Sequence, residues 1–88
     1  MKPKEGIIAQ ELGDEFLLVP IGEAAKDFHG LVRLNETGYF IWKALSEGLN
    51  EEQIASRIVE EYDGVDLEHA KKSVHTLIES LQDAKLLV

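Results

Sequence analysis

The sequence predicts an α+β fold in which the strands precede the helices. One observation is a pair of β-prone runs near the N-terminus, separated by a glycine and an aspartate. Another is a set of three stretches with apolar residues at helical spacing, each preceded by an asparagine or aspartate that suits a helix N-cap. The length of 88 residues suits one domain spanning residues 1–88, with a small core.

The two β-prone runs are Gly6 to Leu12 and Glu15 to Val19. Gly13-Asp14 between them suits a two-residue hairpin turn with glycine first. Pro20 ends the second run because proline has no N–H for a ladder. The next segment, Ile21 to His29, lacks a clear period and is long for a hairpin loop, so we expect a mobile loop there.

The stretch Gly30 to Gly48 joins a third strand directly to a helix. The strand is expected over Gly30 to Leu34, and Asn35 is expected to cap the helix that follows. Gly38 lies inside that helix, where glycine is unfavourable, so we expect it to permit a close approach by another backbone or an aromatic ring. The buried face of the helix is predicted to contain Gly38, Ile41, Trp42 and Leu45.

Two further helices follow. Asn50 and Gln53 form a capping-box pattern at the start of the second, and Gly64 can end it. Asp66 is the expected N-cap of the third. The predicted buried positions of the second helix are Ile54, Ala55, Ile58, Val59 and Tyr62, and those of the third are Leu67, Ala70, Val74, Leu77, Ile78, Leu81 and Ala84. The apolar end of the chain, residues 86–88, is expected to pack onto the domain.

Composition argues against several classes of function. The chain has no cysteine, so it offers no thiolate nucleophile and no cysteine ligand for zinc or an iron–sulfur cluster. His29, His69 and His75 share no spacing that would bring them together on a metal, and we expect no metal site, no cofactor and no enzymatic activity. No apolar run is long enough to span a bilayer, and we expect a cytoplasmic protein that does not bind membranes. A formal charge of −8 makes nucleic acid an unfavourable partner.

The central stretch carries a family resemblance. It consists of a strand followed by Leu34-Asn35-Glu36-Thr37-Gly38, then Ile41-Trp42 and Gly48. This pattern resembles the coenzyme PQQ synthesis protein D (PqqD) family, and the similarity continues through Ile54, Tyr62 and the leucine-rich final helix. The resemblance implies a winged-helix-like arrangement of three N-terminal antiparallel strands and three helices. It also implies a non-catalytic module that recognises the leader of a ribosomally made precursor peptide and presents it to a radical-SAM maturase. Which peptide and which pathway are involved stays open.

Strand addition is the mechanism that a small sheet with a free edge offers, because unpaired N–H and C=O groups can pair with an extended peptide. The family resemblance places the peptide between the third strand and one flank of the third helix. The predicted peptide-binding residues are Gly30, Leu31, Val32, Arg33 and Leu34 of the strand and Lys71, His75, Ile78 and Gln82 of the helix. Tyr39 and Phe40 lie off the buried helix face and are predicted to meet a partner protein or the hairpin.

Three alternatives stay open. The strand edge could be covered by the loop at Ile21 to His29 or by a second copy of the chain, as a homodimer or domain swap. The fold could instead serve a winged-helix DNA-binding protein, although the third helix, Asp66 to Ala84, holds two lysines against four acids, a net −2. A small oligomeric regulatory protein that uses exposed aromatic residues is the remaining alternative.

Overall fold

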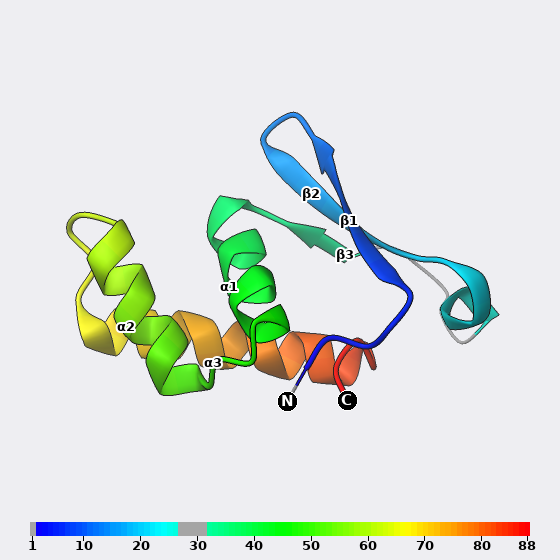
Figure 1. Ribbon diagram of the computed structural model, residues 1–88. Coiled ribbons are helices and arrows are strands. Elements are labelled where there is room, and N and C mark those ends of the chain that lie inside the picture. The colour runs from blue at the N-terminus through cyan, green and yellow to red at the C-terminus, as the bar shows by residue number, and fades with distance from the viewer. Residues whose placement is uncertain (1, 27–31) are drawn as a thin grey trace.

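Three strands and three α-helices follow one another along the chain in a computed structural model that describes residues 2–26 and 32–88 (Figure 1). The strands form one antiparallel sheet in the order β1-β2-β3. The predicted α+β class, with three antiparallel strands before three helices, is therefore confirmed, and winged-helix is only a loose description of it. The elements are β1 (Ile7–Leu12), β2 (Glu15–Pro20), a 3-10 helix η1 (Gly22–Lys26), β3 (Val32–Leu34), α1 (Glu36–Ser46), α2 (Glu51–Glu61) and α3 (Leu67–Asp83).

The β1–β2 hairpin forms as its sequence predicts. Leu12 pairs with Glu15 across the turn, and Gly13 adopts a φ of 61°, the left-handed conformation that glycine permits. β2 also pairs with β3, with Leu17 opposite Arg33. The sheet order leaves β3 at one edge and β1 at the other.

The segment expected to be a mobile loop contains regular structure. Residues Gly22–Lys26 form η1, in which Ala24 is buried. The amide of Ile21 donates to the carbonyl of Gly6 at 2.7 Å, and a Cβ on Gly6 would lie 3.0 Å from the Cβ of Ala24. Residues 21–26 therefore pack against the start of β1. Hydrophobic periodicity does not predict such a contact between separate segments of the chain. Residues 27–31, including Gly30 and Leu31, lie outside the described ranges.

The change from β3 to α1 occurs where the sequence predicts it. The side chain of Asn35 accepts a hydrogen bond from the amide of Gly38 at 2.8 Å and so caps α1. Gly38 does permit a close approach, but of a side chain rather than of a backbone or an aromatic ring. A Cβ at this position would lie 3.3 Å from Cβ and Cδ2 of Leu34 and 3.2 Å from the cap oxygen of Asn35. The strand and the helix are therefore packed tightly at their junction.

Asn35→Ala is expected to lower the free energy of unfolding by about 1 kcal/mol, because the first turn of α1 loses its cap acceptor. Asn35→Asp keeps an acceptor oxygen in the same place and is the matched control, expected to melt close to the wild type. Thermal or urea melts measure the difference. Equal losses in both variants would show that something other than the cap hydrogen bond causes the effect.

The caps of α2 and α3 are also confirmed. Asn50 and Gln53 form a reciprocal capping box, and the carboxylate of Asp66 accepts from the amide of His69 at 2.8 Å. Two predicted core positions are wrong, because Val59 is 37% exposed and Leu67 is 44% exposed. Val59 lies at the margin of its helical stripe, where a small rotation of the helix decides whether a side chain is covered. Leu67 lies in line with the core stripe of α3 but is the first residue of that helix.

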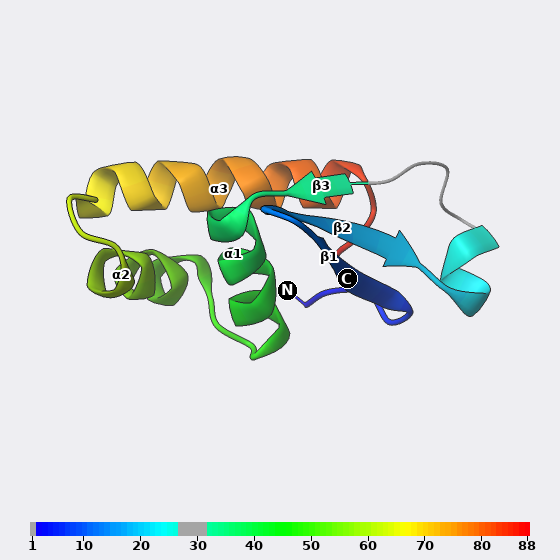
Figure 2. The same ribbon diagram turned by 90° about the horizontal axis from the view of Figure 1, so that it is seen from above.

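The core lies where α1 meets both the sheet and the α2–α3 pair. Figures 1 and 2 show α1 between these two parts, and its buried residues include Ile41, Trp42 and Leu45. The two chain ends pair with each other, with Pro3 bridged to Leu87. Leu86 is 1% exposed but Val88 is 75% exposed, so the predicted packing of the apolar tail is confirmed only in part. Among the described residues, no helix has the length and apolar character needed to cross a membrane.

Candidate functional site

The free edge of β3 is the first component of the candidate site. One side of β3 pairs with β2, and within residues 2–26 and 32–88 no strand pairs with its other side. Val32 is half-buried, Arg33 is exposed and Leu34 is buried. Figures 1 and 2 together show that β3 runs along the C-terminal part of α3 and above it. A segment added to this edge would therefore have α3 beside it.

A surface hollow at the Leu34 end of β3 is the second component. We name it the α1–α3 groove, because one wall is the start of α1 and the other is one face of α3. Its lining residues are Asn35, Thr37, Gly38 and Ile41 on the first wall and His69, Lys72, Ser73, Thr76, Leu77 and Ser80 on the second. Asn35 directly follows β3, so the groove adjoins the end of the strand.

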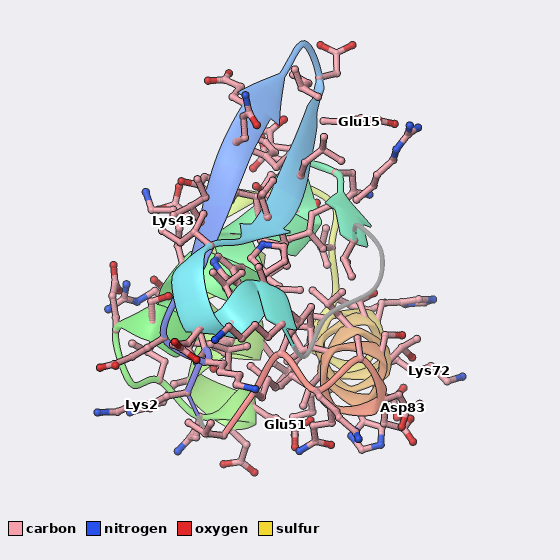
Figure 3. All side chains as sticks on the ribbon, turned by 90° about the vertical axis from the view of Figure 1, so that its right-hand side faces the viewer. Lys2, Glu15, Lys43, Glu51, Lys72 and Asp83 are labelled. Carbon is pink, nitrogen blue, oxygen red and sulfur yellow. The ribbon has the colours of Figure 1, made fainter. Side chains whose placement is uncertain are left out.

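The α1–α3 groove lies on the flank of α3 that carries Ser73 and Ser80. The four helix residues predicted to bind peptide, Lys71, His75, Ile78 and Gln82, do not line it. Ile78 is 3% exposed, and Nδ1 of His75 lies 3.0 Å from Oε1 of Glu51 in α2. Figure 3 shows Lys72 projecting from α3 in a different direction from Glu51. The choice of flank, with Lys71, His75, Ile78 and Gln82 as peptide-binding residues, therefore stays a prediction.

The rest of the predicted edge agrees only in part with the described structure. Val32, Arg33 and Leu34 form β3 as expected, and Gly30 and Leu31 are outside the described ranges. The side chain of Arg33 extends to Glu15 of β2, with 3.7 Å between Nη1 and Oε2. Because both side chains are largely exposed, this ion pair adds little stability and leaves the backbone edge uncovered.

The two aromatic residues predicted to meet a partner make contacts within the chain. Tyr39 stacks on Phe16 of β2 with ring centroids 4.0 Å apart, which confirms the hairpin contact for Tyr39. Phe40 instead meets the ring of Tyr62 edge-on at 5.8 Å, near the end of α2. Both rings are half-buried, so each keeps some surface that a partner could still contact.

Electrostatics at the start of α3 are dominated by His69 and Asp66. Nδ1 of His69 lies 2.8 Å from Oδ2 of Asp66. The hydrogen bond and the charge of this carboxylate raise the pKa of His69, and hydrogen bonds from the backbone and side chain of His69 lower the pKa of Asp66. Because the pKa of His69 is raised in the folded state, its contribution to stability is fully present below the pKa of the unfolded state and is lost as pH rises through the folded-state pKa. Because the pKa of Asp66 is lowered, its contribution is fully present above the pKa of the unfolded state and is lost as pH falls through the folded-state pKa. Both contributions are therefore fully present between roughly pH 4 and 6.5.

Asp66→Asn is expected to move the titration of His69 down toward its ordinary value, because the amide has no charge. Asparagine is also a good N-cap, so the start of α3 should stay folded. A proton NMR titration that follows the imidazole signal of His69 in the wild type and the variant measures the change. An unchanged His69 titration would contradict the assigned cause.

Within the part of the chain that the structure describes, no cluster of three or more histidine, cysteine, aspartate or glutamate side chains could hold a metal ion. What the site offers is a row of backbone groups, a partly apolar floor at Ile41 and Leu77, and a rim of hydroxyl groups with one lysine. Such a surface can hold an extended chain by its backbone and sort it by its side chains.

The sequence contained a usable signal for the groove side of α3. The α3 residues that line the groove follow the spacing of a single helical stripe next to the core stripe: His69, Lys72, Ser73, Thr76, Leu77 and Ser80. The sequence did not predict which face of α3 is turned toward β3, because this depends on how α1 packs between them.

The fold recurs in solved structures. The chain is similar to "TbiB1 in Complex with the TbiA(beta) Leader Peptide", with 25% sequence identity and a TM-score of 0.77, over 99% of this chain and 94% of that chain. It also shares its fold with "Lasso peptide synthetase B1 complexed with the leader peptide", with 20% identity and a TM-score of 0.75, over 93% of this chain and 89% of that one. No curated protein matches the sequence.

The family resemblance seen in the central stretch extends over most of the chain. The matched region starts at the first residue of β2 and ends one residue before the C-terminus, so it includes the β3 edge and both walls of the α1–α3 groove. Since residues 15–87 match the family described as coenzyme PQQ synthesis protein D (PqqD), the chain belongs to the PqqD family.

Proposed function

We propose that this protein is a non-catalytic module that binds the leader of a ribosomally made precursor peptide by strand addition to β3. The observation that carries the proposal is the free edge of β3, which leads directly into the α1–α3 groove. The similarity to TbiB1, whose solved structure contains a leader peptide, supports it.

Strand addition accounts for how a small surface could bind a flexible peptide. Backbone hydrogen bonds to β3 would give most of the affinity, and alternate peptide side chains would point toward α3 or toward solvent. A disordered peptide loses conformational entropy when it is ordered in this way, so we expect micromolar rather than picomolar binding. The free backbone groups of β3 would then have a function instead of being a site of aggregation.

The bound peptide must be delivered to an enzyme that carries the chemistry, and we propose a radical-SAM maturase as that partner. We place this complex in the cytoplasm, where ribosomal precursors are made. Phe40 and Tyr39 are candidates for the contact with the maturase, because both rings are half-buried and keep some exposed surface on α1. Phe40→Asp removes a ring contact as well, so a melt must accompany any loss of complex formation.

Titration calorimetry with the precursor peptide encoded beside the gene tests the proposal. We expect one peptide to bind per chain, and no heat change with a random DNA duplex, because the protein surface is acidic. The maturase should modify its precursor when this protein is present and lose most of its activity when it is removed. Binding of the duplex but not of the peptide, or full maturase activity without the protein, would reject the proposed function.

A second copy of the chain would compete for the same edge if two β3 strands paired in a homodimer or a domain swap. In that case the peptide and the second copy exclude each other, and added peptide should convert dimer into monomer. Light scattering with and without peptide distinguishes a free β3 edge from one that is covered by a second copy.

A further inference from the structure

We propose that the α1–α3 groove selects an acidic side chain in the bound peptide, with Lys72 and the hydroxyl groups of Ser73 and Thr76 binding the carboxylate. This inference rests on the proposed function, because it concerns a peptide already paired with β3. It adds a chemical criterion for which leader sequences are accepted.

The position of the groove favours contact with such a peptide. β3 is only three residues long, and the residue that follows it, Asn35, already lines the groove. A paired peptide advances about 3.3 Å per residue. One that extends past Leu34 in either direction of pairing therefore passes over the groove, and every second side chain points toward α3.

The groove wall differs in charge from the rest of the molecule. The chain has 17 acidic residues among 88, yet none of the described residues that line the groove is acidic. Lys72 is exposed and forms no ion pair within residues 2–26 and 32–88. His69 also lines the groove with its Nδ1 held by Asp66, and Lys72 is the unpaired lysine among the described lining residues.

Hydroxyl groups supply further donors beside Lys72. Ser73 and Thr76 are exposed, and neither side chain hydrogen-bonds to another residue in the described ranges. A carboxylate accepts several hydrogen bonds and has no proton to donate, so it matches an ammonium next to two hydroxyl donors. The apolar floor formed by Ile41 and Leu77 suits the methylene stem of an aspartate or glutamate.

The opposite flank of α3 is a less favourable site for the same side chain. There His75 is placed between the carboxylates of Glu51 and Glu79, at 3.0 and 3.5 Å. Lys71 is an exposed cation on that flank, but an acidic peptide residue would meet the carboxylates of Glu51 and Glu79 there as well, whereas no described lining residue of the groove is acidic. The contrast between the two flanks therefore favours one register of the peptide as well as one type of side chain.

Selection from a displayed library of random peptides tests the inference without a known ligand. Wild-type protein should enrich peptides with aspartate or glutamate at one fixed distance from a β-prone core. A selected peptide and its analogue with asparagine or glutamine at that position should differ about fivefold in affinity, the upper value for an exposed ion pair, and less in high salt. Lys72→Gln should reduce this ratio to about one.

Lys26→Gln is the matched control, since it removes the same charge from η1, outside the groove, and should leave the ratio unchanged. Ser73→Ala gives a second reading if Lys72→Gln melts below the wild type, and it should lower the ratio in part. The inference is overturned if the wild type binds the acidic peptide and its amide analogue with about equal affinity, or if the difference in affinity remains in both groove variants. Neither result would contradict peptide binding to β3. If no peptide is enriched at all, the proposed function fails together with it.

Discussion

Trp42→Ala is expected to lower the free energy of unfolding by roughly 3–5 kcal/mol, the range for a large core aromatic cut back to alanine. Trp42 is the only tryptophan and is 5% exposed, on the face of α1 that also buries Ile41 and Leu45. Because α1 joins the sheet to the α2–α3 pair, a cavity there weakens contacts on both sides. The expected loss is a large part of the stability of a chain this small.

Urea melts followed by circular dichroism measure this loss, since the variant lacks the indole fluorophore. Lys43→Ala is the matched control, because it shortens the next residue of the same helix at an exposed position. Its loss should stay within about 0.5 kcal/mol. A Trp42→Ala variant that melts with the wild type would show that the core is not centred on α1.

Val32→Pro and Arg33→Pro are expected to have opposite effects on folding and on peptide binding. Adjacent N–H groups of a strand point to opposite edges, so one of these amides faces β2 and the other faces the free edge. Proline removes the N–H at its own position and adds a ring there. The variant that loses a bond to β2 should melt lower, whereas the variant that loses the free-edge donor should melt like the wild type and not bind detectable peptide.

Arg33→Ala is the control for this pair, because it removes the side chain next to Glu15 and keeps the backbone N–H. It should melt and bind nearly as the wild type does. Melts and titration calorimetry with the same precursor peptide give both readings for each variant. If the proline variant that keeps the wild-type melt also keeps the wild-type affinity, the peptide does not pair with β3.

Local sequence signals were sufficient for much of the fold. Gly13 marks the hairpin turn, and Asn35, Asn50 and Asp66 start the three helices at the expected places, since caps and turns depend on residues within a few positions of each other. The 3-10 helix at Gly22–Lys26 was not predicted, because it depends on the contact of Ala24 with Gly6, far back in the chain.

The candidate site could be predicted only in part for the same reason. The strand Val32–Leu34 follows from local pattern, but the flank of α3 that faces it depends on long-range packing through α1. Lys72 and His75 are three positions apart on one helix, yet Lys72 lines the groove and His75 meets Glu51 of α2. Residue type alone could not separate them, because both flanks of α3 are polar.

Amide hydrogen exchange with and without saturating precursor peptide tests strand addition to β3 most directly, because it reads the backbone groups that are proposed to pair. We expect exchange to slow within Val32–Leu34, at the amide that faces the free edge, and to stay unchanged along β1 at the other edge of the sheet. Slowed exchange along β1 with none in β3, despite tight binding, would contradict the account and place the peptide on the opposite edge.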